Sequence, residues 1–334
     1  MLRPAFLVPI VCAPMGGGPS TPALVAAVGG AGGLGFLAAG YKSAGAMREE
    51  IAALRVSTAA PFGVNLFVPS APFEDRAALE RYAAELEPDA ARYGVSPGDP
   101  RWTDDDWEAK LEAVAAERPA AVSFTFGCPG RAVVEGLRAR EIAVWCTVTT
   151  PGEAEEAGCA GVDALVVQGS EAGAHQGSFV DDDREPLPLL TLLQLVRAVS
   201  GLPLVATGGI ATTAGVAAAL AAGASAAQLG TAFLLCPEAG TSDVHRAALR
   251  TRGQTRLTRA FTGRRARGIV NRFMRDHPDA PHAYPELHYA TAPIRAAARQ
   301  AGDPEAVNLW AGQAFALARE LPAAELVATL APAR

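Results

Sequence analysis

The chain has 334 residues, of which 50% are hydrophobic and 19% are charged, and its formal net charge is −6. So large an apolar fraction excludes a disordered protein, and a chain of this length can bury a sizeable core without a metal or disulfide. The excess of acidic over basic residues and the low aromatic content of 6% argue against a nucleic-acid-binding surface. Five cysteines without a C-x-x-C pair are typical of reduced thiols in a cytoplasmic enzyme. We therefore expect a cytoplasmic α/β protein.

The N-terminal stretch from Pro4 to Tyr41 contains no charged residue and so resembles a signal peptide or a membrane span. A membrane-spanning helix needs about 20 apolar residues without helix breakers. This stretch is interrupted repeatedly by proline and glycine. It therefore predicts a buried strand, a glycine loop, a helix and a second strand, and no membrane role.

Eight short apolar runs alternate with helical patterns over the first 235 residues. Near-continuous apolar runs are typical of parallel strands covered by helices, and eight such units predict a closed (β/α)₈ barrel, or TIM barrel, rather than an open doubly wound sheet. Helices are expected between them at Ala44–Arg55, Arg131–Arg140, Leu189–Val199 and Thr212–Ala222. The predicted strands are Ile10–Pro14, Leu34–Ala38, Phe62–Val68, Ala121–Phe126, Ile142–Val148, Ala164–Gln168, Pro203–Ala206 and Ala226–Gly230.

Two segments do not fit the regular alternation. Residues 69–119 are too long for one connection and contain two charged helical stretches, Glu74–Leu86 and Asp104–Glu117. After Leu235 the alternation stops and an arginine-rich region begins. We expect a barrel over residues 1–235, completed by residues 305–334, and a mainly helical cap over 236–304. The final helix, Leu309–Ala318, is expected to return to the barrel.

Glycines follow the seventh and eighth predicted strands. Active sites of such barrels lie at the C-terminal ends of the strands, and phosphate often binds after strands seven and eight. Gly208 and Gly209 follow the seventh strand, and Gly230 and Thr231 follow the eighth. Backbone N–H groups at adjacent glycines can approach phosphate oxygens, and Thr231 adds a hydroxyl. The same glycines could simply make tight turns, but their recurrence on two consecutive strands favours a phosphate site.

One histidine follows the sixth predicted strand, in the glycine-punctuated segment from Val167 to Gly177. His175 at the barrel mouth suits proton transfer or hydrogen bonding, with a pKa near working pH. A solvated loop histidine is the alternative. The other four histidines lie in the cap region without metal-ligand spacing, so we predict no metal site.

Two further patterns are set aside. Gly30–Gly35 satisfies G-x-G-x-x-G but follows a helix and enters a strand, the reverse of a dinucleotide fingerprint. Nine arginines and no acid lie between Arg250 and Arg275, where glycines interrupt any continuous basic helix. We expect some of these arginines to be buried or to steer anions rather than to bind nucleic acid.

A set of motifs, in chain order from about residue 8 to 315, resembles the nitronate monooxygenases (formerly 2-nitropropane dioxygenases), in particular the bacterial class I enzymes. Flavin-dependent enoyl-ACP reductases and some quinone reductases share the barrel and the histidine loop, so an NAD(P)H-dependent flavin reductase is the alternative. A phosphosugar- or nucleotide-binding barrel without redox chemistry is a third possibility. The motifs are Pro9–Gly17, Gly63–Phe67, Ser123–Gly127, Gln168–Gly177, Gly208–Ala211, Gln228–Thr231, Thr258–Gly263 and Leu309–Gln313.

The resemblance implies non-covalent FMN and the oxidation of alkyl nitronates, such as propionate 3-nitronate, with O2 to carbonyl compounds and nitrite, by a monomer or homodimer. His175 matches the active-site histidine of the family, although Ala174 replaces a glycine that usually precedes it. The flavin ring is expected against Ala13, Pro14 and Met15, and its ring or ribityl edge against Asn65 and Gln168. The phosphate end is expected at Gly173, Gly208, Gly209, Gln228, Leu229, Gly230 and Thr231.

Overall fold

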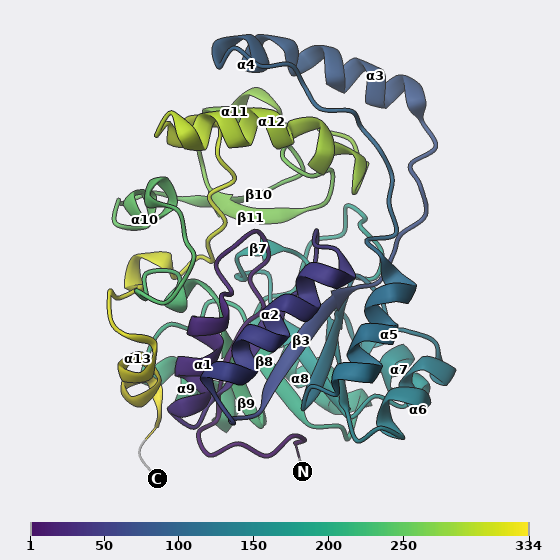
Figure 1. The fold of residues 1–334 in the computed structure, drawn as a ribbon, viewed down its shortest axis with the longest axis vertical. Helices are drawn as coiled ribbons and strands as arrows, with labels where there is room; N and C mark the ends of the chain where they lie inside the picture. The colour runs from purple at the N-terminus through teal and green to yellow at the C-terminus, as the bar shows by residue number, and fades with distance from the viewer. Residues whose placement is uncertain (1, 333–334) are drawn as a thin grey trace.

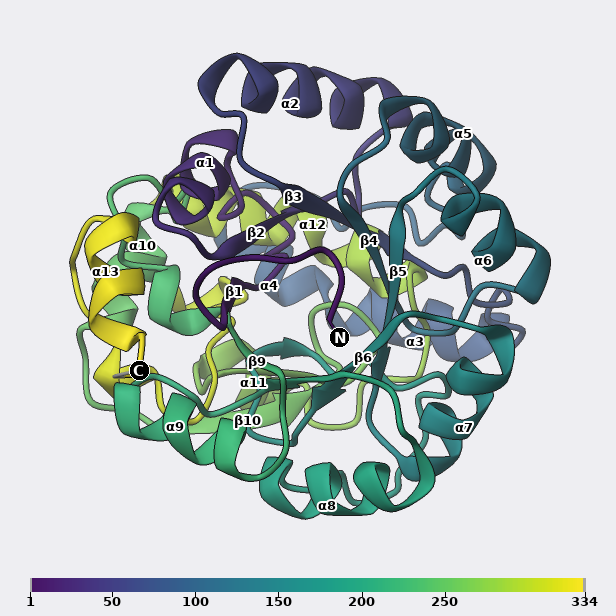
Figure 2. The ribbon, with the colours of Figure 1, turned by 90° about the horizontal axis from the view of Figure 1, so that it is seen from below.

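Eight parallel strands close into a barrel in the computed structural model, which describes residues 2–332 (Figure 2). The ring closes because β1 pairs with β2 on one side and with β9 on the other. Each predicted strand is present within two residues of its expected ends, so the predicted (β/α)₈ barrel is confirmed. The strands are β1 (Ile10–Cys12), β2 (Leu34–Ala38), β3 (Phe62–Phe67), β4 (Ala121–Thr125), β5 (Ala143–Val148), β6 (Ala164–Gln168), β8 (Leu204–Thr207) and β9 (Ala226–Leu229).

Helices surround the barrel on its outside (Figure 2). Three of them begin at a threonine whose hydroxyl accepts a hydrogen bond from a backbone N–H of the first turn, namely Thr21, Thr150 and Thr212, as expected for N-caps. The helices are α1 (Pro22–Gly30), α2 (Ala44–Ser57), α5 (Trp107–Glu117), α6 (Arg131–Arg138), α7 (Pro151–Ala160), α8 (Leu189–Val199), α9 (Thr213–Ala221) and α13 (Ala323–Leu330).

The N-terminal half of the barrel is filled by side chains. Phe36 and Trp145 pack together with their ring centroids 5.2 Å apart, and the Trp145 indole donates to the Arg3 carbonyl oxygen at 2.7 Å. Both rings are fully buried. Since this end is closed, space for a ligand is left at the C-terminal ends of the strands.

A cap covers those strand ends (Figure 1). Its central element is a three-stranded antiparallel sheet in the order β10, β11, β7, so the cap predicted as mainly helical also contains strands. The 3₁₀ helices η1 (Thr231–Phe233), η2 (Pro304–Ala306) and η3 (Phe315–Leu317) lie in the connections. The cap elements are α10 (Asp243–Leu249), β10 (Thr255–Thr258), β11 (Ala266–Ile269), α11 (Arg272–Asp276) and α12 (Glu286–Gln300), joined by β7 (Ala174–His175) from the barrel.

The long insertion after β3 also belongs to the cap. Its helices α3 (Arg76–Glu85) and α4 (Glu87–Arg92) lie above α11 and α12 (Figure 1). Tyr82 and Leu86 share a buried apolar cluster with Phe273, and the Tyr82 hydroxyl donates to the Ala260 carbonyl oxygen at 2.6 Å. The sequence showed that the insertion was too long for a connection but not where it packs.

The helix predicted at Leu309–Ala318 is wrong. Residues 309–312 run alongside β11, where Ile269 N donates to Leu309 O at 2.9 Å and Ala311 N donates to Arg267 O at 3.2 Å. Tertiary partners thus take backbone groups that a helix would have paired internally. The helix that returns to the barrel is α13, which packs against α1 and α9. No helix of residues 2–332 is long and apolar enough to cross a membrane.

Candidate active site

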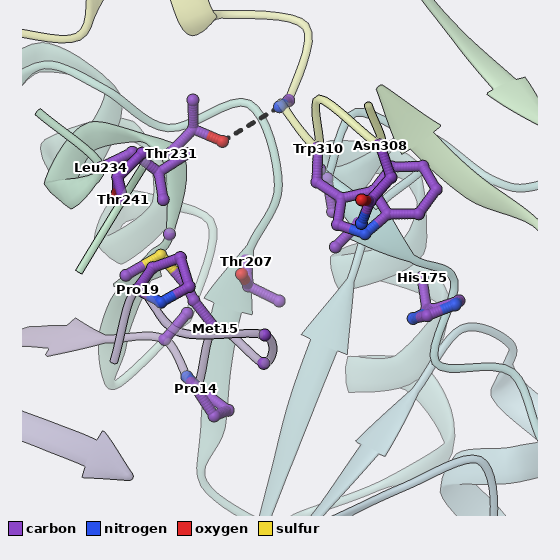
Figure 3. Close-up of a pocket in the computed structure, with 18 of the residues that line it drawn as sticks. Pro14, Met15, Pro19, His175, Thr207, Thr231, Leu234, Thr241, Asn308 and Trp310 are labelled. Carbon is purple, nitrogen blue, oxygen red and sulfur yellow. Dashed lines mark hydrogen bonds between the residues drawn. The ribbon is translucent and has the colours of Figure 1, made fainter. Parts of the chain in front are cut away.

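A cavity of about 430 Å³ lies between the strand ends and the cap (Figure 3). This volume is within the range of small-molecule and cofactor sites. All of the residues predicted for cofactor binding or catalysis border the cavity: Ala13, Pro14, Met15, Asn65, Gln168, Gly173, His175, Gly208, Gly209, Gln228, Leu229, Gly230 and Thr231.

The ends of β8 and β9 form one side of the cavity. Gly208 and Gly209 have φ angles of +120° and +68°, which L-residues with a side chain rarely adopt. The Thr231 hydroxyl accepts a hydrogen bond from Gly312 N at 3.0 Å (Figure 3), so its own hydrogen can be donated to a ligand. A Cβ on Gly173 would lie 2.5 Å from Gly312 N, so this glycine is required by the close approach of the two chain segments. This end of the cavity can surround a phosphate with backbone N–H groups and a hydroxyl.

His175 belongs to β7 and not to a free loop. β7 pairs with β11, with His175 opposite Ala266. Ala174 has a φ of +61°, so the residue that replaces the family's glycine adopts the left-handed conformation that favours glycine, at a cost of about 1–2 kcal/mol. The pairing of β7 with the cap therefore holds the His175 backbone in place.

The hydrogen bonds of His175 are compatible with two tautomers of its imidazole. His175 Nε2 lies 3.0 Å from the Thr262 hydroxyl, which in turn donates to the Arg264 carbonyl oxygen at 3.2 Å. When the hydroxyl hydrogen is used in that second bond, Nε2 carries the proton and Nδ1 has the free lone pair; when it is donated to Nε2 instead, Nδ1 carries the proton. Thr262 comes from the Thr258–Gly263 motif, but its contact with His175 could not be read from the sequence.

The His175 imidazole is uncharged at neutral pH. Burial is the main cause of a pKa lowered to about 3, and the positive charges of Arg264 and Arg295 lower it further. The expectation of a pKa near working pH is therefore wrong. A neutral imidazole can donate one hydrogen bond and accept another, but its low pKa makes it a weak base.

Aromatic rings that the sequence analysis did not single out enclose His175. The ring centroids of Phe126, Tyr284 and Trp310 lie 5.5, 5.6 and 5.8 Å from that of the imidazole. Figure 3 shows Trp310 and Asn308 beside His175. Phe126 lies in the Ser123–Gly127 motif and Trp310 in the Leu309–Gln313 motif, whereas Tyr284 comes from the cap. Together these rings limit the access of water to the imidazole.

Two predicted ligand residues use their amides within the protein. Gln168 Nε2 donates to the His175 carbonyl oxygen at 3.1 Å, and Gln168 Oε1 accepts from Gly177 N at 2.6 Å. Asn65 Nδ2 donates to the hydroxyls of Ser123 and Thr125 at 2.9 and 3.0 Å. Gln168 therefore fixes the segment that carries His175, in addition to bordering the cavity.

Arginine burial agrees with the sequence analysis. Arg264 and Arg267 are 4% and 7% exposed. Arg264 donates to the carbonyl oxygens of Ser178 and Gln176 and lies 4.1 Å above the Phe126 ring. Within residues 2–332, no cluster of His, Cys, Asp and Glu could hold a metal ion.

Three histidines with lowered pKa values predict a pH-dependent stability; His245 is buried, whereas His175 and His288 are partly exposed. The pKa of His245 is lowered to about 4 and that of His288 is well below its usual value, in both cases mainly by burial, as for His175. The unfolded chain therefore binds more protons than the folded chain below about pH 6.5. Stability is fully present above that pH and is lost as the pH falls toward 4, by up to about 1.4 kcal/mol per pH unit for each histidine.

Urea unfolding at pH 7.5, 6, 5 and 4.5 tests this expectation. His245→Gln should make the fall less steep, because one proton-binding difference is removed. A free energy of unfolding that stays constant between pH 7.5 and 4.5 would contradict the assignment of uncharged histidines in the folded protein.

The closed parallel barrel and the cavity at its C-terminal strand ends define a (β/α)₈-barrel enzyme. A family model described as nitronate monooxygenase matches residues 2–333. The chain belongs to the nitronate monooxygenase family, whose members are oxidoreductases that typically depend on a flavin.

Similar proteins cover the chain almost completely. It is 43% identical to the nitronate monooxygenase of Pseudomonas aeruginosa, over 96% of this chain and 95% of that protein. It is 42% identical to the nitronate monooxygenase of Paraburkholderia phytofirmans, over 96% of this chain and 91% of that protein. The crystal structure of a nitroalkane oxidase from Streptomyces ansochromogenes has 50% identity and a TM-score of 0.95, covering 97% and 95% of the two chains. FabK from Thermotoga maritima has 26% identity and a TM-score of 0.74, covering 97% and 92%.

Proposed function

We propose that this enzyme binds FMN in the cavity and oxidises alkyl nitronates, including propionate 3-nitronate, with O2 to carbonyl compounds and nitrite. The observation that carries the proposal is the combination in one cavity of glycine-ended strands β8 and β9 with His175. The positive φ angles of Gly208 and Gly209 and the donor hydrogen of Thr231 fit a phosphate. FMN, when bound, supplies the electron acceptor.

The protein itself binds and orients the substrate. An alkyl nitronate is a delocalised anion, which requires hydrogen-bond donors on its nitro oxygens and a dry site next to the acceptor. The Thr262 hydroxyl can donate or accept, so it can support either tautomer of His175. With the proton on Nδ1, the imidazole donates to a nitro oxygen; with Nδ1 free, it can accept the α-proton of a neutral nitroalkane.

A direct test compares substrates and reductants. We expect oxygen consumption and nitrite release with propyl-2-nitronate and propionate 3-nitronate, measured side by side. Under anaerobic conditions, NADH and NADPH should reduce the flavin slowly or not at all. Rapid loss of the visible flavin absorption on mixing with either nucleotide, without nitronate turnover, would instead support the NAD(P)H-dependent flavin reductase. A purified protein without flavin absorption would support a barrel without redox chemistry.

A further inference from the structure

A buried arginine that borders the cavity has no carboxylate partner among residues 2–332. Arg295, on α12, is 7% exposed and borders the cavity. Its Nε donates to the Thr291 hydroxyl at 3.0 Å and its Nη2 donates to the His288 carbonyl oxygen at 2.6 Å. Within residues 2–332, no carboxylate oxygen lies within 4.0 Å of this guanidinium, and no hydrogen bond is formed by its Nη1. The positioned guanidinium therefore has one nitrogen left for a ligand.

Two other arginines of the cap have carboxylate partners. Arg259 pairs with Asp181 at 2.9 Å, and Arg272 pairs with Asp89 at 2.6 Å. The buried Arg264 and Arg267 have none within 4.0 Å in the described part of the chain, but they donate to backbone carbonyl oxygens and do not border the cavity. A buried charge without such a partner is unfavourable for folding, so it is typical of a binding function. Burial lowers the pKa of Arg295 to about 10, and the guanidinium therefore stays charged at neutral pH.

Arg295 lies on the substrate side of the cavity. Its partner His288 is stacked on Tyr41, with ring centroids 3.8 Å apart and planes 3° from parallel. Tyr41 follows β2 and packs against Phe67 at the end of β3. The glycines proposed to bind the phosphate follow β8 and β9. In the barrel, β1 separates these two strands from β2 and β3. The positive charge of Arg295 also contributes to the lowered pKa of His175. Arg295 is thus placed near the imidazole and not at the phosphate end.

We propose that Arg295 is the residue that binds the carboxylate of a carboxylated nitronate such as propionate 3-nitronate, so that replacing it weakens activity on this substrate far more than on a nitronate with an uncharged chain. This inference rests on the proposed function. The nitronate group carries one delocalised charge, whereas a carboxylated nitronate carries a second charge that needs its own cation. Nη1 can donate a charge-assisted hydrogen bond to a carboxylate oxygen, and Thr291 and His288 hold the guanidinium in position before the ligand arrives.

The test compares propionate 3-nitronate with butyl-1-nitronate, which lacks the carboxylate. Arg295→Met should lower kcat/KM for propionate 3-nitronate by about 30- to 100-fold, mainly through KM, since a charged hydrogen bond is lost. The value for butyl-1-nitronate should change by less than about threefold. Arg295→Lys should recover part of the loss because it restores the charge. Arg256→Gln, which removes an exposed arginine on β10, is the matched control for net charge.

Binding gives a readout that does not depend on turnover. Under anaerobic conditions, calorimetry should show tighter binding of 3-nitropropionate than of 1-nitrobutane to the wild type, and Arg295→Met should abolish the difference. FMN content should be normal, and the melting temperature should not fall. Equal losses on both nitronates, or loss of FMN, would overturn the proposal, because Arg295 would then bind the nitronate group or the cofactor. If the wild type oxidises no nitronate, the proposed function fails, while the calorimetric difference still tests the role of Arg295.

Discussion

Gly230→Asp is expected to yield protein without FMN. Gly230 has an ordinary negative φ of −106°, and an added Cβ would lie 3.5 Å from Ala13 Cβ and 3.8 Å from Met15, which is normal van der Waals contact. The side chain is therefore accommodated, and the main change is a carboxylate beside the proposed phosphate. Two like charges about 4 Å apart repel by about 4 kcal/mol at an effective dielectric constant of 20, which weakens FMN binding by about a thousandfold.

The matched control is Gly230→Asn, which has nearly the same shape and no charge. We expect it to weaken FMN binding by no more than about tenfold. The measurement is the flavin-to-protein ratio after purification, followed by titration of FMN into the apoprotein. Gly209→Asp should also lose FMN, but Gly209 has a φ of +68° and its Cβ would lie 3.0 Å from Glu171 Cβ, so backbone strain contributes there. Full FMN occupancy in Gly230→Asp would refute the phosphate site.

His175→Asn separates the two possible roles of the imidazole. If Nδ1 accepts the α-proton, the variant should lose about a hundredfold to a thousandfold in kcat/KM on neutral nitroalkanes, because an amide cannot act as a base. Preformed nitronates need no proton removal, so they should lose less than about tenfold. FMN content should be normal, since the proposed phosphate contacts lie on β8 and β9. Equal losses on both substrate forms would mean that His175 binds the nitro group or shapes the site.

The pH profile of the wild type adds an independent check. The His175 pKa is lowered to about 3, so the imidazole is in its proton-accepting form throughout pH 5 to 8. Protonation of His175 should therefore not lower the rate on neutral nitroalkanes between pH 5 and 8. A histidine with an ordinary pKa would be half protonated near pH 6.5, and the rate would fall below that pH. An acid limb near pH 6.5 that disappears in His175→Asn would show that the bound substrate or cofactor raises the pKa of this group.

The cap explains why the site contains more than the barrel motifs. The sheet formed by β10, β11 and β7 fixes His175, and α12 supplies His288 and Arg295. The barrel motifs form the proposed phosphate end of the cavity, while the charges and rings of the proposed substrate side come largely from the cap. Similar barrels can therefore share the cofactor site and differ in substrate, which is consistent with the lower identity to FabK than to the nitronate monooxygenases.

The barrel and the position of its site were determined by local sequence patterns. Apolar runs of strand length, threonine N-caps and glycines after the seventh and eighth strands each depend on residues close in the chain, and barrel order then places the strand ends together. Because the residues at one end of a closed barrel converge, the order of the strands alone assigns His175 and Gly230 to the same cavity.

The tertiary structure decided the features that depend on distant segments. Residues 309–312 have a helical pattern, but pairing with β11 keeps them extended. The pKa of His175 reflects burial and arginines of the cap, which are far from it in the sequence. The sequence could not predict that Arg295 lacks a carboxylate partner among the described residues. That property depends on where the fold places every aspartate and glutamate. Local patterns determine the elements, whereas burial and charge compensation arise only when separate parts of the chain pack together.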